Sequence, residues 1–206
     1  MKTEHLEILV EEPSMETFLR VLLPRLLGDK TSFEIYPHQC KEDMLLKLPA
    51  RLKGYVNWLP ETWRIVVVVD RDDEDCGELK LRLEAMAMKV RLVTRSAAKG
   101  EIYSVVNRIA IEELEAWYFG DWAAVRAAFP RVTNAIPAQS KYRDPDAITG
   151  GTWEAFERIL QKAGYYKGGL RKIEAARFIA AHIEPERNNS KSFQILRTAL
   201  LEMVTL

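Results

Sequence analysis

The sequence predicts an α/β fold, with a mostly parallel sheet flanked by helices and a C-terminal helical appendage. Strand-like and helix-like segments alternate along roughly the first two thirds of the chain, and such alternation is typical of parallel sheets with helices on both faces. Residues 65–69 are five β-branched residues in succession. A continuous apolar run of this kind indicates a central strand that is buried on both faces.

The first half of the chain supplies the elements on either side of that strand. We expect strands over 5–10, 31–37 and 64–69, with helices over 14–27 and 42–59 between them. The first helix should begin near Ser14, a residue that favours helix starts, because apolar residues recur at helical spacing after it. Pro24 and Pro49 fall inside the two helical patterns, so each helix is expected to kink or end at its proline.

The second half is expected to complete the sheet and then change character. We expect a helix over 76–88, strands over 89–94 and 105–111, and a helix over 112–122. Residues 130–151 contain three prolines and two glycines and are expected to be irregular. Helical patterns follow over 152–163, 170–182 and 190–203. We therefore divide the chain into an α/β domain, 1–129, and an irregular segment plus helical appendage, 130–206, that packs on it.

Composition excludes several classes of protein. The chain has 206 residues, 48% of them hydrophobic, and 30 Lys and Arg against 30 Asp and Glu, so it can bury a core and is neither disordered nor strongly basic. A nuclease is still compatible, since only a local patch must be positive. No apolar run approaches the ~20 residues of a membrane span, and residues 5–10 resemble a strand more than a signal peptide. Cys40 and Cys76 have no partner at a metal-ligand spacing, so we expect reduced thiols, no zinc site and a cytoplasmic location.

Acidic residues follow three of the predicted strands. Glu11 and Glu12 follow the first, Asp70 and Asp72 the third, and the acids of 112–115 the strand over 105–111. The carboxyl ends of parallel strands meet at one edge of a sheet, about 4.8 Å apart for neighbours, so we expect these carboxylates to converge. Several like charges repel strongly unless a cation neutralises them. Oxygen ligands suit Mg²⁺ or Mn²⁺, so the pattern predicts a site for one or two such ions.

Simpler interpretations of these acids stay open. Glu12 lies where a helix is expected to begin, and first turns of helices favour acids even without a site. The acids of 73–75 fit a solvated helix start for the same reason. Asp70 is different because it adjoins buried valines, where an unpaired charge is costly. A receiver-like or phosphatase-like Mg²⁺-binding protein that uses the same acids is an alternative, whereas glycine-rich Walker and dinucleotide motifs are absent.

The order of these motifs resembles the Toprim fold, whose domains carry a glutamate after the first strand and an Asp-x-Asp after the third. Residues 10–16, VEEPSME, are similar to the V-E-G-x-[ST]-x-E motif of nucleases of the OLD (overcoming lysogenisation defect) type, with Glu12 in place of glycine. The whole chain resembles a Toprim-like family of domains of unknown function. The segments that carry this resemblance span residues 9–180 and read LVEEPSMETFLR, VVVVDRDDED, IAIEELEAWYFGD, YRDPDAITGGTW and GGLRKIEAARFIA.

This resemblance implies two-metal cleavage of phosphodiester bonds, with the two cations about 3.5–4 Å apart. The metal ligands that it implies are Glu11, Glu16, Asp70, Asp72, Glu113 and Glu115. Of these, Glu11, Asp70 and Asp72 would be catalytic, together with Lys172, which matches a late lysine that stabilises charge on the transferring phosphate. Members of the family are commonly encoded beside an ATPase. The resemblance therefore also implies an ATPase partner and a role in defence against phage or other mobile elements.

The last third of the chain could supply contacts to nucleic acid. Residues 151–198 contain nine Lys and Arg against five Asp and Glu, and this excess could hold a DNA backbone through Arg171, Lys172 and Arg177. An ordinary helix surface would give the same count. A non-catalytic regulatory or scaffold subunit with a Toprim-like fold is therefore the other alternative, which the neutral overall charge and Glu12 keep open.

Overall fold

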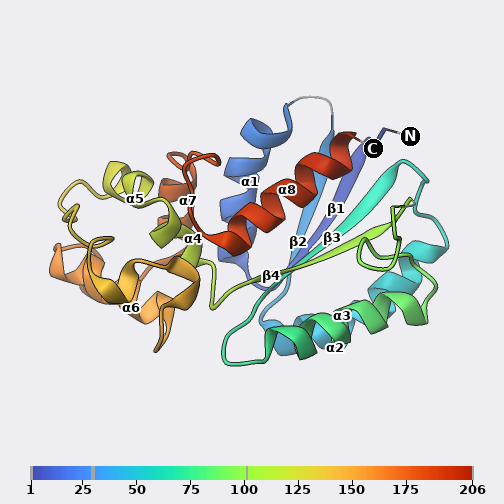
Figure 1. Cartoon of the computed structure of the whole chain (residues 1–206), viewed down its shortest axis with the longest axis horizontal. Helices are drawn as coiled ribbons and strands as arrows, with labels where there is room; N and C mark the ends of the chain where they lie inside the picture. The colour runs from blue at the N-terminus through green and yellow to red at the C-terminus, as the bar shows by residue number, and fades with distance from the viewer. Residues whose placement is uncertain (1, 29–30, 101, 206) are drawn as a thin grey trace.

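The computed structural model describes residues 2–28, 31–100 and 102–205. The sheet found in these residues has four parallel strands in the order β2-β1-β3-β4. The strands are β1 (His5–Val10), β2 (Ser32–Pro37), β3 (Trp63–Asp70) and β4 (Val105–Ala110). The predicted α/β class is confirmed, and the arrangement is consistent with a Toprim-like fold (Figure 1).

Helices connect the strands and make up most of the C-terminal third. The α-helices are α1 (Pro13–Leu27), α2 (Lys41–Val56), α3 (Cys76–Lys89), α4 (Glu115–Gly120), α5 (Trp122–Ala128), α6 (Thr152–Lys162), α7 (Lys172–Ala180) and α8 (Lys191–Thr205). Two short 3-10 helices, η2 (Ser140–Tyr142) and η3 (Pro145–Ala147), lie in the segment predicted to be irregular. The three helices predicted at the C-terminal end are confirmed as α6, α7 and α8.

The sheet separates two helical layers. Helices α2 and α3 cover one face, and α1 and α8 cover the other (Figure 1). Along β3, Val66 and Val68 belong to the core beneath α1 and α8, whereas Val67 and Val69 belong to the core beneath α2 and α3. All four valines are at most 1% exposed. Burial on both faces explains why this strand has a continuous apolar run instead of an alternating one.

The C-terminal helices share the core of the α1 face. Helix α8 packs against β4 and α1, and α7 packs along α1. At one end of the α1–α7 pair, Arg25 donates to the carbonyl oxygens of Ala180 and Ile183 at 3.1 and 2.8 Å. At the other end, Lys172 lies near Glu12, just before the start of α1. The two helices therefore run in the same direction, which brings the start of α7 to the carboxyl ends of the strands.

The strand predicted over 89–94 is wrong. Helix α3 continues to Lys89, and only Thr94 pairs with β4, through a single bridge to Val105. Between them Arg91 has a φ of 64°, a left-handed conformation that interrupts an extended chain. Leu92 packs into the core beneath α3. The apolar residues of this segment therefore close a turn over the core and do not extend the sheet.

Neither internal proline ends its helix. Helix α1 continues past Pro24 to Leu27, and α2 continues past Pro49 to Val56. Leucines on both sides of each proline are buried, and this burial offsets the backbone hydrogen bond that proline cannot make. The predicted helix over 112–122 is interrupted instead, because the Asp121 carboxylate caps α5 by accepting from the Ala124 N–H at 3.3 Å.

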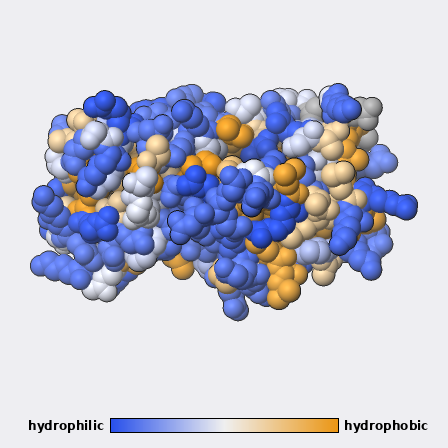
Figure 2. Space-filling model, turned by 60° about the horizontal axis from the view of Figure 1, so that its bottom comes forward, coloured by the Kyte–Doolittle hydropathy of each residue, from blue (hydrophilic) through white to orange (hydrophobic). Residues whose placement is uncertain are grey.

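The outer face of α2 and α3 is mainly hydrophilic. Apolar residues on this side of the molecule occur in separate groups among hydrophilic ones (Figure 2). Among the described residues, the large apolar side chains with the greatest exposure are Leu46 on α2 and Leu81 on α3, at 79% and 70%. Within the described ranges, no helix has the length and apolar character that crossing a membrane requires.

Candidate functional site

Carboxylates from three strands converge at the carboxyl edge of the sheet. We call Glu11, Glu12, Asp70, Asp72 and Glu115 the acidic rim. β1 and β3 are neighbours in the sheet, and the backbone N–H of Asp70 donates to Glu11 Oε2 at 3.0 Å. β4 lies on the other side of β3 and leads, through a short connection, into α4, which starts at Glu115. The parallel arrangement thus brings together the acids that follow β1, β3 and β4.

Asp70 is the innermost acid of the rim. It is the last residue of β3 and is only 5% exposed, and its Oδ1 is buried with no hydrogen-bond partner among the described residues. Burial raises the pKa of the Asp70 carboxyl well above its ordinary value, and the negative charges of Glu11, Glu12 and Glu115 raise it further. The fold therefore holds a carboxyl group here that is costly to ionise without a cation.

Glu115 has the same character at the start of α4. It is 1% exposed, and both of its carboxylate oxygens are buried with no partner in the described residues. Burial raises the pKa of Glu115 to about 8, although the positive charge of Lys172 acts in the opposite direction. One helical turn later, the Tyr118 hydroxyl is also buried, with no hydrogen-bond partner within the described ranges. Burial, together with the charges of Glu115, Glu12 and Asp70, raises the pKa of Tyr118.

Glu11 connects the buried acids to the surface. Burial raises the pKa of Glu11 to about 7, partly offset by the hydrogen bond from the Asp70 N–H, and the nearby Asp72 charge raises it as well. Two of the rim carboxyls with shifted pKa values, Glu11 and Glu115, therefore titrate near neutral pH. Groups with such strongly shifted pKa values gather at functional sites more often than elsewhere.

The backbone around the rim adopts an unusual conformation. Asp72 and Glu112 have φ values of 50° and 61°, in the left-handed region that non-glycine residues seldom occupy. The Asp72 N–H donates to the Glu112 carbonyl at 2.9 Å, and the Arg71 N–H donates to the Ala110 carbonyl at 2.9 Å. These bonds hold the loops after β3 and β4 together. Strained residues of this kind persist where the surrounding structure fixes them, which is common at active sites.

Basic residues pair with the outer acids. Lys41 is 5% exposed, and its Nζ lies 2.6 Å from Asp72 Oδ2 and 3.4 Å from Glu74 Oε1. Burial lowers the pKa of Lys41, but the hydrogen bond to Asp72 and the surrounding carboxylates outweigh burial and raise it overall. Arg71 pairs with Glu112, and Lys172 Nζ lies 3.6 Å from Glu12 Oε2. Asp72, Glu74, Glu112 and Glu12 thus each have a basic partner within 4 Å, whereas no ion pair is formed by Asp70 or Glu115 among the described residues.

Replacement of Lys41 by methionine should destabilise the protein by about 1–2 kcal/mol at pH 8, because Asp72 would lose its largely buried cationic partner. The loss stays this small because the Asp72 side chain is half exposed and water can solvate its charge. Urea unfolding followed by circular dichroism would measure the loss. Lys47→Met is the matched control on the same helix, since the ion pair between Lys47 and Asp43 is a surface i,i+4 pair. An equal loss in both variants would contradict a special role for Lys41.

Glu113 caps helix α6. Its Oε2 accepts from the Thr152 N–H at 3.0 Å, the Thr152 hydroxyl at 2.8 Å and the Trp153 N–H at 2.9 Å. One carboxylate oxygen of Glu113, a predicted metal ligand, is thus occupied by the cap of α6. Glu16, the other ligand predicted outside the rim, pairs with Arg20 at 2.8 Å. The predicted nucleic-acid contacts Arg171 and Arg177 are exposed on or beside α7.

Replacement of Glu113 by alanine should lower the free energy of unfolding by about 1–2 kcal/mol, because the first turn of α6 would lose its cap. Thermal and urea unfolding would measure this loss. Glu113→Gln keeps one acceptor oxygen and should lose less. A variant that keeps full stability but loses Mn²⁺ binding would instead make Glu113 a metal ligand.

The rim offers suitable donor atoms for a hard cation, but not a finished coordination shell. Its donors are carboxylate oxygens, which Mg²⁺ and Mn²⁺ prefer, and three buried oxygens of Asp70 and Glu115 have unused acceptor capacity. Within residues 2–28, 31–100 and 102–205, no group of three or more His, Cys, Asp or Glu side chains is arranged to hold a metal ion. The acidic rim therefore fits a hard cation in two respects, the type of its donor atoms and the unused acceptor capacity of its buried oxygens.

Comparison with protein families supports one coarse assignment. The family model described as "Domain of unknown function (DUF4276)" matches residues 10–201. The chain belongs to the DUF4276 family. The predicted membership of a family of domains of unknown function is thereby confirmed. No curated protein and no solved structure matches the chain. The DUF4276 match extends over every residue of the acidic rim and over Lys172.

Two residues near the rim of this DUF4276 chain were missed by sequence reasoning. Lys41 is the first residue of α2, a position where the helix dipole disfavours a cation. A lysine at this unfavourable position indicates that a nearby acid compensates its charge, and this could have been inferred from the sequence. Tyr118 is buried, and its position three residues after Glu115 places its hydroxyl beside the acids.

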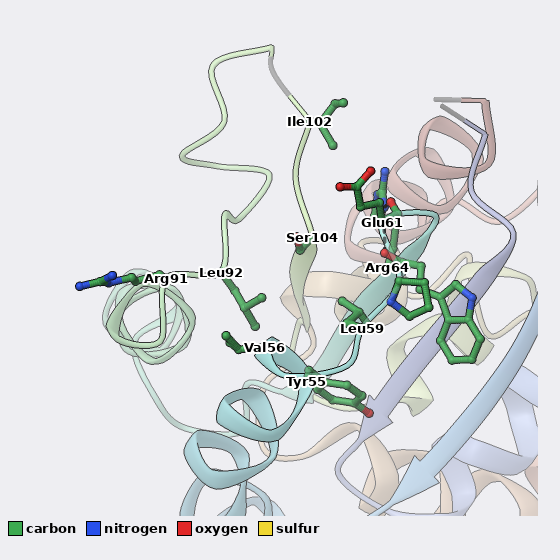
Figure 3. Close-up of a pocket in the computed structure, with 11 residues that line it drawn as sticks. Tyr55, Val56, Leu59, Glu61, Arg64, Arg91, Leu92, Ile102 and Ser104 are labelled. Atoms are coloured by element: carbon green, nitrogen blue, oxygen red, sulfur yellow. Dashed lines mark hydrogen bonds between the residues drawn. The ribbon is translucent and has the colours of Figure 1, made fainter.

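A hollow at the opposite, amino end of the strands is separate from the rim (Figure 3). It has a volume of about 460 Å³ and is lined mainly by apolar residues of the loops before β3 and β4, including Leu59, Leu92 and Ile102. Glu61, Arg64 and Arg91 also line it, and the end of the Arg91 side chain extends away from the other labelled residues (Figure 3). This hollow contains none of the residues for which the sequence predicts metal chemistry.

Proposed function

We propose that this chain is a Mg²⁺- or Mn²⁺-dependent phosphodiesterase of Toprim type that cleaves nucleic acid. The observation that carries the proposal is a pair of buried carboxyls, Asp70 and Glu115, beside Glu11 at the carboxyl edge of the sheet. Asp70 Oδ1 and both carboxylate oxygens of Glu115 have no hydrogen-bond partner in the part of the chain that the structure describes. Such groups destabilise a fold unless they are protonated or meet a cation. Their position also suits the proposal, since ligands of open α/β sheets bind outside the carboxyl ends of the strands.

The residues that would hold one or two ions are Glu11, Asp70, Asp72 and Glu115, with Glu16 and Glu113 as further candidates from the Toprim resemblance. A bound ion would polarise the phosphate and make a water molecule more acidic. Lys172 would contribute a positive charge to the site. The charges of Glu115 and Glu12 outweigh burial and raise the pKa of Lys172, so its ammonium stays positive and can attract a phosphate to the rim.

The nucleic acid would approach along α7. Arg171 and Arg177 are exposed near Lys172, so these three residues could contact successive phosphates, and DNA is our preferred substrate. The resemblance of the whole chain to a Toprim-like family of domains of unknown function, whose members are commonly encoded beside an ATPase, supports an ATPase partner and a role in phage or mobile-element defence. These finer assignments depend on the resemblance.

Incubation of supercoiled plasmid DNA with the protein and Mn²⁺ tests the proposal, with single-stranded RNA in parallel. We expect nicked plasmid, and no nicking when EDTA is present. Calorimetric titration with Mn²⁺ at pH 8 should give one or two binding sites. If Mn²⁺ neither binds nor supports cleavage of either substrate, the proposal fails.

Lys172→Met separates phosphate chemistry from metal binding. We expect about 10²-fold slower cleavage, because the variant loses a positive charge at the reacting phosphate, together with unchanged Mn²⁺ affinity. Lys167→Met removes an exposed lysine from the loop before α7 and should cleave at the normal rate. Equal rates for both variants would remove Lys172 from the mechanism and would point to a contaminating nuclease.

A non-catalytic scaffold is a second candidate, favoured by the ion pairs that Lys41, Arg71 and Lys172 make with acids of the rim and of the loops around it. A scaffold is expected to cleave neither substrate under any condition, whether or not it binds Mn²⁺. A receiver-like or phosphatase-like function would instead require phosphorylation of Asp70 by acetyl phosphate. Intact-mass measurement after incubation with acetyl phosphate would detect it.

A further inference from the structure

The loop after β3 surrounds a cation of the protein itself, the ammonium of Lys41. The Nζ atom donates to the Arg71 carbonyl oxygen at 2.9 Å. The same atom lies 2.6 Å from Asp72 Oδ2 and 3.4 Å from Glu74 Oε1. An ammonium has three N–H donors, so these three oxygens can satisfy all of them. Carboxylate and backbone carbonyl oxygens are also the ligands that hard divalent ions take in proteins, so Lys41 occupies oxygens that could otherwise receive a metal ion.

The position of Lys41 distinguishes it from an ordinary surface lysine. It is only 5% exposed and lies in the first turn of α2, where the helix dipole disfavours a positive charge. Burial of an ammonium is costly unless oxygen atoms compensate its charge, and the loop after β3 supplies these atoms. The charge of Lys41 also opposes the rise in the pKa of Glu11. The ammonium is therefore within electrostatic reach of the inner acids of the rim.

The six carboxylates that the Toprim resemblance implies for two ions divide into two equal groups. Three are engaged by a basic side chain or by the cap of α6, and these are Asp72, Glu16 and Glu113. Three form no ion pair within the described part of the chain, and these are Glu11, Asp70 and Glu115. The carboxylates left for a metal ion are therefore half of those implied for two ions.

The charge of the inner acids indicates the same number of ions. Glu11, Asp70 and Glu115 carry at most three negative charges when all of them are ionised. One divalent cation offsets two of these charges. Two divalent cations would exceed all three, even before the positive charges of Lys41 and Lys172 are added. Like charges at such short separations repel strongly, so a second ion is disfavoured in the protein without substrate.

We propose that the Lys41 ammonium takes the place of one of the two metal ions, so that the acidic rim binds a single divalent cation. The ligands of this cation would be Glu11, Asp70 and Glu115. The inference rests on the proposed function, because it concerns the same metal site. Lys41 is a positioning residue in this role, since its donors are occupied by the loop after β3. Unlike a second ion it cannot dissociate, so its charge is present at every metal concentration.

The number of ions that the wild type binds is the first test, and the probe is Mn²⁺ alone. Equilibrium dialysis at pH 8 with metal analysis should give one ion per chain. The EPR spectrum should be that of an isolated Mn²⁺ ion, without the spin coupling of two ions about 3.5–4 Å apart. Two ions per chain in the wild type would overturn the proposal and leave the proposed function in place. No bound Mn²⁺ would overturn both.

Lys41→Met removes the ammonium and releases its three oxygens. We expect this variant to bind a second Mn²⁺ ion per chain, because Asp72, Glu74 and the Arg71 carbonyl then offer ligands to a cation. Lys47→Met removes a surface ion pair from the same helix and should bind one ion, like the wild type. A single ion in Lys41→Met would overturn the proposal. A second ion in both variants would also overturn it, because the extra site would then lie away from Lys41.

Unfolding by urea gives an independent measurement of the same exchange. The midpoint of Lys41→Met, which we expect to be below that of the wild type without metal, should recover toward the wild-type value at saturating Mn²⁺, because the second ion binds only the folded state. Lys47→Met should show only the rise that the wild type shows. A deficit of Lys41→Met that Mn²⁺ does not reduce would show that no ion replaces the lysine. If Lys41→Met does not fold, the ion count of the wild type decides the question.

Discussion

Replacement of Asp70 by asparagine should abolish Mn²⁺-dependent cleavage and make the metal-free protein more stable at pH 8. The carboxylate would lie at the centre of the metal site, and loss of such a ligand removes several kcal/mol of transition-state stabilisation, or roughly 10³-fold in rate. The stability gain has a separate cause. Asp70 Oδ1 is buried without a partner among the residues that the structure describes, and burial raises the pKa of this carboxyl, so ionisation at pH 8 destabilises the fold.

The combination of both effects makes this variant informative. Plasmid nicking and urea unfolding at pH 8 would be measured on the same preparation. Asp73→Asn makes the same chemical change at an exposed position three residues away, and should alter neither property. If Asp70→Asn keeps full activity, the rim is not the metal site. If it unfolds the protein, Asp70 is instead required for the fold.

Replacement of Glu115 by glutamine should remove much of the pH dependence of stability. Glu115 has a pKa of about 8 in the folded protein, against an ordinary value of 4.5. A raised carboxyl pKa means that the folded state binds the proton more tightly than the unfolded state. The stabilisation is therefore complete below pH 4.5 and is lost as the pH rises to about 8. Glutamine cannot ionise, so the variant should not lose stability in this way.

The expected difference is large because Glu115 is buried. From pH 5 to pH 9, the free energy of unfolding of the wild type should fall relative to Glu115→Gln by on the order of 4 kcal/mol. Urea unfolding at several pH values measures this. Glu78→Gln, at an exposed glutamate of α3, should follow the wild type. Parallel curves for the wild type and Glu115→Gln would show that Glu115 ionises freely in the fold.

Added Mn²⁺ should oppose the fall in the free energy of unfolding that occurs as the pH rises. A cation bound by ionised rim carboxylates stabilises the folded state most where the protons have left, so its effect on stability should grow with pH. A Mn²⁺ effect that is equal at pH 5 and pH 9 would place the ion outside the rim.

Local sequence patterns were sufficient for most elements of the fold. The run over 65–69 identified β3, and the acids that directly follow β1 and β3 could be placed at one sheet edge because parallel strands all end on the same side. The pattern over 89–94 failed, because six residues of mixed apolar character do not distinguish a strand from a turn that buries Leu92. Pro24 and Pro49 do not end their helices for a related reason, since packing of the neighbouring leucines outweighs the local helix-breaking tendency of proline.

That acids gather at the carboxyl edge of a parallel sheet could be predicted from the sequence, because alternating strand and helix patterns indicate parallel strands, which all end at one edge. Folding of the whole chain settles which of these acids have a basic partner and which are buried with oxygens that lack one among the described residues. Lys41, Arg71 and Lys172 come from three different connections, and Glu113 is used by a helix 39 residues away. Charge compensation depends on distances of a few ångströms between segments remote in sequence, and no local pattern records those distances.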